Sequence, residues 1–62
     1  MNKLRKHYML IDFHSELALN QNIKKAIRET ALWYKVTESY LVRTIEQEYG
    51  TEYITRLTME ID

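Results

Sequence analysis

The 62-residue chain contains no cysteine, no proline and a single glycine, Gly50. Without cysteine, neither a disulfide nor a cysteine-based metal cage can stabilise so short a chain, so its core or association with another copy must do so. The absence of proline predicts long helices with short breaks, in one domain over residues 1–62. No apolar run approaches membrane-spanning length, and the N-terminus lacks a signal-peptide segment. We therefore expect a cytoplasmic protein without a membrane partner.

The chain also has no net charge, but its charges are unevenly distributed. Residues 1–28 carry six Lys and Arg against two carboxylates, whereas residues 29–62 carry three against seven. The basic half suits an acidic partner, or the acidic half of a second copy. Apolar residues make up 45% of the chain and include seven aromatics, which is enough for a core and argues against disorder.

Residue combinations typical of enzymes are missing as well. No nucleophile has an obvious base, and there is neither a Gly-rich phosphate loop nor a carboxylate pair suited to a pocket. His7 and His14 lie seven residues apart with Asp12 and Glu16 nearby, but two histidines at this spacing are weak evidence for a metal site. We expect a non-enzymatic protein with no metal and no cofactor.

The segment 3–19 presents a wide apolar face if it is helical, as in a buried or dimerising helix. A strand over residues 7–13 is the alternative, because the apolar run there is too short to show a period. We favour the helix, since no second strand is visible in the chain. A chain this small cannot bury so much apolar surface alone, so we expect a homodimer. The predicted dimer contacts are Tyr8, Ile11, Phe13 and Leu17, with Trp33 as an aromatic anchor.

Residues 23–49 predict two helices joined by a tight turn. Asn22 and Thr37 are placed to cap them, because short polar side chains accept hydrogen bonds from the free N–H groups of a first helical turn. Leu41 and Ile45, four residues apart, give the second helix an inward face.

A short third helix is expected over residues 51–58, after Gly50. Glycine adopts the left-handed conformation without a Cβ clash and therefore commonly ends a helix. Tyr53, Ile54 and Leu57 would fold back on the preceding pair. The sequence thus predicts an all-α fold of three to four short helices with a helix-turn-helix, as a dimer.

The run from Ala31 to Leu57 resembles a helix-turn-helix unit of AraC/XylS-type transcription regulators. The matching positions are Ala31, Thr37, Ser39, Tyr40, Leu41, Arg43, Ile45, Gly50, Tyr53 and Leu57. Lys35 stands where the family usually has a turn glycine, and Arg56 stands where it has an aromatic residue. The family's DNA-binding region has two such units, whereas this chain has room for one. The resemblance implies a helix-turn-helix shape but not the family's effector binding.

A helix-turn-helix suggests a small transcriptional regulator that binds duplex DNA, of a size found in phages and mobile elements. Side chains on the outer face of the second helix would contact bases, and cations on the first would hold phosphates. The candidate base contacts are Thr37, Ser39, Arg43 and Gln47. The candidate phosphate contacts are Lys24, Lys25 and Arg28.

The charge of the second helix argues against DNA, because Glu38, Glu46 and Glu48 accompany Arg43 there and carboxylates repel phosphates. A second interpretation is therefore a regulatory protein that docks on a host or other partner protein without DNA contact. A third takes residues 7–13 as a strand paired across a dimer, as in ribbon-helix-helix repressors.

Overall fold

The computed structural model describes residues 2–61. Its four helices are α1 (Lys3–Asn20), α2 (Ile23–Tyr34), α3 (Glu38–Tyr49) and α4 (Tyr53–Ile61). No strand occurs among the described residues, so the all-α prediction is confirmed. The strand over residues 7–13 is wrong, and with it the ribbon-helix-helix arrangement. Within the same residues, no helix is both long and apolar enough to cross a membrane.

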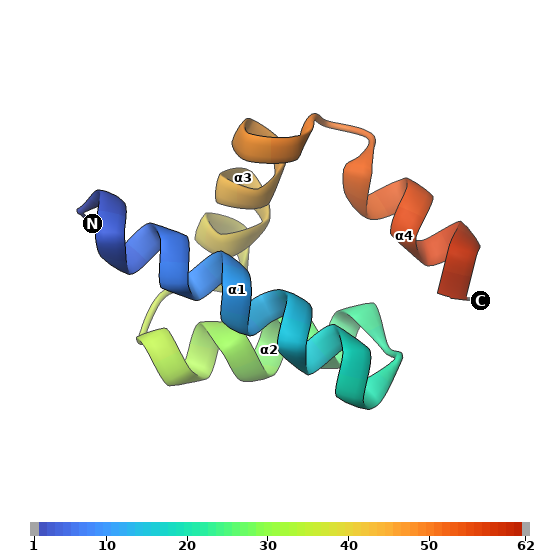
Figure 1. The fold of residues 1–62 in the computed structure, drawn as a ribbon, viewed down its shortest axis with the longest axis horizontal. Coiled ribbons are helices and arrows are strands. Elements are labelled where there is room, and N and C mark those ends of the chain that lie inside the picture. Colours follow the sequence, from blue (N-terminus) through green and yellow to red (C-terminus); the bar gives the residue numbers. More distant parts are fainter. Residues whose placement is uncertain (1, 62) are drawn as a thin grey trace.

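Helices α1 and α2 lie side by side and run in opposite directions (Figure 1). After the turn at the end of α2, α3 passes across this pair, and α4 returns toward the connection between α1 and α2 (Figure 1). Glu60 and Ile61, at the end of α4, accordingly share a shallow groove with Gln21 in that connection.

The first three helices each begin at a side-chain cap. The side chains of Asn2, Asn22 and Thr37 accept a hydrogen bond from the backbone N–H three residues later, at 2.8, 3.0 and 3.0 Å. The predicted caps at Asn22 and Thr37 are therefore confirmed. Gly50 ends α3 with φ 101°, a backbone conformation that a side chain would strain.

A single core joins α1, α2 and α3. Its buried apolar members are Met9, Leu10, Phe13, Leu17, Ala26, Ile27, Ala31, Leu41 and Ile45. Leu41 and Ile45 are fully buried, which confirms the predicted inward face of α3. Ala31 is 2% exposed, so its small side chain lets the neighbouring helices approach closely.

The assignment of Phe13 and Leu17 to a dimer interface is wrong. They are 0% and 7% exposed and belong to the chain's own core. Helix α1 has two apolar stripes, and helical periodicity alone does not say which one a partner helix of the same chain covers. The stripe that stays exposed contains Leu4, Tyr8 and Ile11.

Helix α4 is the least buried element. It begins at Tyr53 and continues to Ile61, so the predicted range 51–58 starts too early and stops too soon. None of its residues is fully buried, although Tyr53, Ile54 and Leu57 pack against the core as expected.

A polar aromatic cluster holds α4 to α1 and α3. His14 Nδ1 donates to the Leu10 carbonyl at 2.7 Å, and its Nε2 accepts from the Tyr53 hydroxyl at 2.8 Å. The assignment follows because a carbonyl only accepts, which places the proton of the neutral ring on Nδ1. Tyr49 stacks on Tyr53 with ring centroids 4.6 Å apart. Burial, with Tyr49 and Glu60 nearby, raises the pKa of Tyr53.

His14 therefore has a structural role. Both of its ring nitrogens are engaged, and His7 is exposed elsewhere on α1. Within residues 2–61, no group of three or more His, Asp and Glu side chains is arranged to hold a metal ion.

Candidate nucleic-acid interface

The turn between α2 and α3 is closed by two backbone hydrogen bonds. The Lys35 N–H donates to the Leu32 carbonyl at 3.2 Å, and the Val36 N–H donates to the Ala31 carbonyl at 3.0 Å. This pair of bonds is the Schellman motif, whose left-handed position usually holds glycine. Lys35 occupies that position with φ 57°. The turn thus has the expected glycine geometry although the glycine is missing.

Helix α3 buries one side and exposes the other. Leu41, Thr44 and Ile45 are buried on the core side. All four predicted base-contacting residues, Thr37, Ser39, Arg43 and Gln47, are exposed. The Thr37 oxygen accepts the capping hydrogen bond from the Tyr40 N–H, which leaves its hydroxyl proton free to donate.

A shallow groove between α2 and α3 collects part of the predicted site. Lys24 from α2 lines it together with Ser39 and Arg43 from α3. Lys25 and Arg28 are exposed on α2 but do not line this groove, and neither do Thr37 and Gln47. The structure therefore brings together one predicted phosphate contact and two predicted base contacts.

Carboxylates share the groove with these cations. Glu38 and Glu46 line it, and Ile27 and Val42 provide its apolar surface. Its four charged side chains are two cations and two carboxylates, so it presents no net charge to a phosphate backbone.

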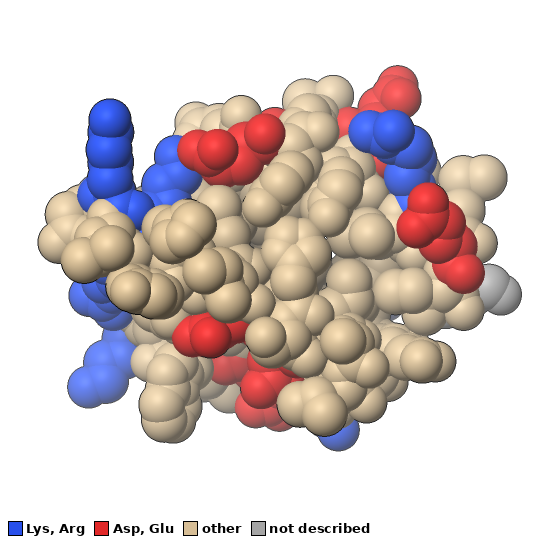
Figure 2. All heavy atoms as spheres, viewed as in Figure 1, with Lys and Arg blue, Asp and Glu red and all other residues tan. Residues whose placement is uncertain are grey.

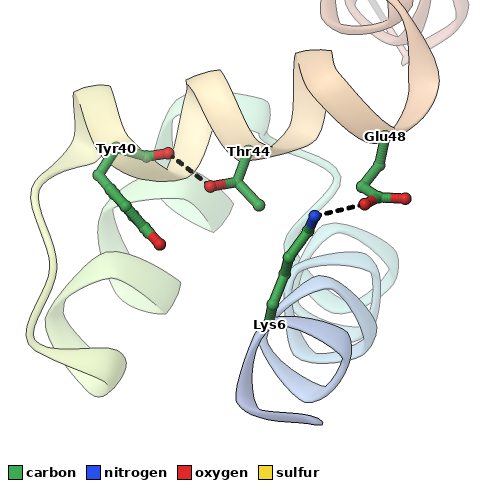
Figure 3. A network of polar contacts seen from close by, with 4 residues as sticks. All are labelled: Lys6, Tyr40, Thr44 and Glu48. Carbon is green, nitrogen blue, oxygen red and sulfur yellow. Dashed lines mark hydrogen bonds and ion pairs between the residues drawn. The ribbon is translucent and has the colours of Figure 1, made fainter. Parts of the chain in front are cut away.

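The third glutamate of α3 is directed elsewhere. Glu48 forms an ion pair with Lys6 of α1, across the interface between these helices (Figure 3). In the same region Thr44 donates its hydroxyl to the Tyr40 carbonyl at 2.9 Å (Figure 3). Glu48 therefore contributes less repulsion at the groove than its place in the sequence suggests.

The basic N-terminal segment meets the end of α2 at a basic end of the molecule, which sequence reasoning did not predict. Lys and Arg gather where α1 begins and α2 ends (Figure 2). There the Arg5 guanidinium donates to the Tyr34 carbonyl and lies 5.8 Å from the centre of the Tyr34 ring. The carbonyl is one of the free acceptors at the end of α2, where a cation is favoured. The two residues are 29 apart in sequence, so no local pattern reveals this contact.

The remaining predicted interface residues lie on two elements. Tyr8 and Ile11 are 53% and 45% exposed on α1, and Leu4, which was not predicted, extends their stripe at 63%. Trp33 is 80% exposed on α2.

Comparisons of the chain with protein-family models, with curated proteins and with solved structures found no match.

Proposed function

We propose that the protein is a small transcriptional regulator that binds duplex DNA through α3. The observation that carries the proposal is the groove in which Lys24, Ser39 and Arg43 converge from the two helices of the helix-turn-helix. An exposed helix after a tight turn is the element that enters the major groove in proteins of this architecture.

Each residue has a distinct role in this proposal. Arg43, near the middle of α3, offers a guanidinium whose paired donors match the O6 and N7 acceptors of guanine. Ser39 and Gln47, one turn to either side, can contact neighbouring bases. Lys24 holds a phosphate and thereby sets the position of α3 in the groove.

We infer that the regulator acts as a homodimer joined through the exposed stripe of α1. Leu4, Tyr8 and Ile11 form an apolar surface there that none of the four described helices covers. A dimer doubles the cations that face DNA and predicts a palindromic site. Sedimentation should show a dimer that Ile11→Glu converts into a folded monomer; a wild-type monomer at micromolar concentration contradicts this inference.

A salt titration of binding to random duplex DNA tests the main proposal. Lys24→Ala should weaken binding to all duplexes alike and reduce the salt slope by about one, because one phosphate contact is lost. Arg43→Ala should cost about 1–3 kcal/mol at a selected site and relax its sequence preference. Arg56→Ala is the matched control, since Arg56 is exposed on α4 and does not line the groove.

Charge reversal inside the groove sharpens this test. Glu46→Lys replaces a groove carboxylate with a cation and should raise nonspecific DNA affinity. Glu48 is unsuited to this change because of its pairing with Lys6. If neither wild type nor Glu46→Lys binds any duplex at low salt, the DNA proposal fails.

The second candidate function is docking on a partner protein without DNA contact. The carboxylates of Glu38 and Glu46 beside Arg43 favour it, because a groove of alternating charge suits a protein surface better than a phosphate backbone. In this case Glu46→Lys should abolish capture of the partner, and Lys24→Ala should leave the negligible DNA binding unchanged.

A further inference from the structure

A second groove lies between α1 and α2, and it differs in chemistry from the one described above. It has a volume of about 440 Å³. The lining residues are Asp12, Ser15, Glu16, Glu29, Thr30, Trp33 and Tyr34. They include three carboxylates, two aromatic rings and no Lys or Arg. Acidic atoms are visible where α1 and α2 run side by side (Figure 2).

The three carboxylates differ in what they already bind. Asp12 accepts a hydrogen bond from the Tyr34 hydroxyl, and Glu16 accepts one from the Asn20 amide at 3.0 Å. Glu29 is exposed and forms no ion pair or side-chain hydrogen bond with any residue in the range 2–61. The groove therefore has one carboxylate with no partner among the described residues, beside two that keep further lone pairs.

Thr30 provides a second observation at this groove, independent of its acidic residues. It is 1% exposed, lines the groove, and its hydroxyl oxygen has no hydrogen-bond partner among the described residues. A buried hydroxyl without a partner is unfavourable, and native proteins seldom retain one. Thr44, the other buried threonine, has its partner in the Tyr40 carbonyl. A hydrogen-bond donor that reaches the floor of the groove would satisfy Thr30.

Trp33 adds an aromatic surface suited to a cation. The residue is 80% exposed, so its ring is accessible to a ligand. Glu29 precedes Trp33 by four positions, which places the carboxylate and the ring on the same side of α2. A cation beside Glu29 can therefore also contact an aromatic face.

We propose that this groove binds an arginine side chain from a basic segment of a partner protein. A guanidinium has five N–H donors and no acceptor, which matches a site of carboxylate and hydroxyl oxygens. It also binds carboxylates in a bidentate manner and stacks on aromatic rings, unlike an ammonium group. Leu32 on the same helix does not line the groove but is 68% exposed, and it offers apolar surface that a protein segment can cover and a free amino acid cannot.

Trp33 is the only tryptophan of the chain, so its fluorescence reports directly on the groove. The probes are a capped peptide with three arginines spaced by glycine, the same peptide with three lysines, and free arginine. We expect saturable binding of the arginine peptide at low salt, weaker binding of the lysine peptide, and still weaker binding of free arginine.

The variant Glu29→Gln should lower affinity for the arginine peptide about fivefold, the size expected for one partly exposed ion pair. Glu52→Gln is the matched control, because Glu52 is exposed in the turn between α3 and α4 and does not line the groove. Both changes are on the surface, and circular dichroism checks that the variants fold.

Several outcomes overturn the proposal. Absence of saturable binding excludes a cation site, as does an equal effect of Glu29→Gln and Glu52→Gln. Equal affinity for the lysine peptide excludes an arginine-specific site, and equal affinity for free arginine indicates a small-molecule site. If sedimentation shows a dimer that Glu29→Gln dissociates, the groove is occupied by a second copy. None of these results bears on the α2–α3 groove, so the DNA proposal stands or falls separately.

Discussion

Helix α2 separates two grooves that differ in chemistry. On one side, with α3, Lys24 and Arg43 alternate with two glutamates. On the other, with α1, the carboxylates of Asp12, Glu16 and Glu29 lie beside two aromatic rings without a lining Lys or Arg. A chain of zero net charge thus presents two surfaces of different character, because residues three or four apart share one face of a helix and the residues between them point to other faces. The sum of charges hides this difference, and only the placement of each side chain reveals it.

The largest expected effect tests whether both grooves depend on one folded unit. Leu41 is fully buried, so Leu41→Ala should reduce the free energy of unfolding by about 2–5 kcal/mol, a large share of the stability of so small a domain. Leu32→Ala makes the same change at a position that is 68% exposed and should stay within about 0.5 kcal/mol of wild type. Chemical denaturation measures both, and similar losses would contradict a core that includes α3.

Much of the framework around Leu41 could be predicted from sequence, because it depends on local rules. The caps at Asn22 and Thr37 require only a short polar side chain before a helical segment. The inward face of α3 follows from apolar residues four apart. Even the turn at Lys35 was located correctly, although the glycine usual there is absent.

Features that depend on distant residues could not be predicted. The choice between the two apolar stripes of α1 is made by packing against α2 and α3, so Phe13 was placed on the wrong surface. The acidic groove combines Asp12 with Thr30 and Trp33, about twenty positions further along the chain, and no sequence motif connects them. The sequence predicts which sides of α2 and α3 are exposed. It does not predict that Glu38 and Glu46 share a groove with Lys24.

The second largest expected effect is on stability, and it differs between the two buried threonines, Thr30 and Thr44. Thr30→Val keeps the shape of the side chain and removes the hydroxyl without a partner, so the free protein should gain about 1–2 kcal/mol of stability. Thr44→Val is the matched change on α3. It removes the hydrogen bond to the Tyr40 carbonyl and should cost about 1 kcal/mol.

Thermal or chemical denaturation measures both stability changes. A gain for Thr30→Val with a loss for Thr44→Val would support the view that the Thr30 hydroxyl is retained in the groove between α1 and α2 for a ligand. A loss of stability in Thr30→Val would show that this hydroxyl already has a partner in solution.

A smaller effect on stability is expected from the hydrogen bond between Tyr34 and Asp12, which both line the groove between α1 and α2. This bond raises the pKa of Tyr34 from about 10 to about 12. Only the neutral phenol can donate to the carboxylate. Because the pKa of Tyr34 is raised in the folded state, the stability that this hydrogen bond contributes is complete below pH 10 and is lost as the pH rises through 12. The variant Tyr34→Phe should cost about 1 kcal/mol at neutral pH, since the bond is partly exposed to solvent.

The stability difference between wild type and Tyr34→Phe should shrink between pH 10 and pH 12. All other ionisable groups are common to the two proteins, so their contribution cancels in this difference. A gap that stays constant over the whole range would show that the hydroxyl does not donate to Asp12.

The smallest expected effect lies at the turn that joins α2 to α3. Lys35 has φ 57°, where the Cβ of an L-residue meets the following carbonyl oxygen at a cost of roughly 1–2 kcal/mol. Glycine avoids this clash but has more freedom in the unfolded chain, which offsets about half of the gain. Lys35→Gly should therefore stabilise the protein by about 0.5–1 kcal/mol. Lys25→Gly, the same change on an exposed position of helix α2, should instead cost about 1 kcal/mol. Denaturation curves of the two variants should shift in opposite directions.

Binding at either groove should stay unchanged in Lys35→Gly, since this residue lines neither of them. If Lys35→Gly is instead less stable than wild type, its side chain makes a contact at the basic end of the molecule that outweighs the backbone strain.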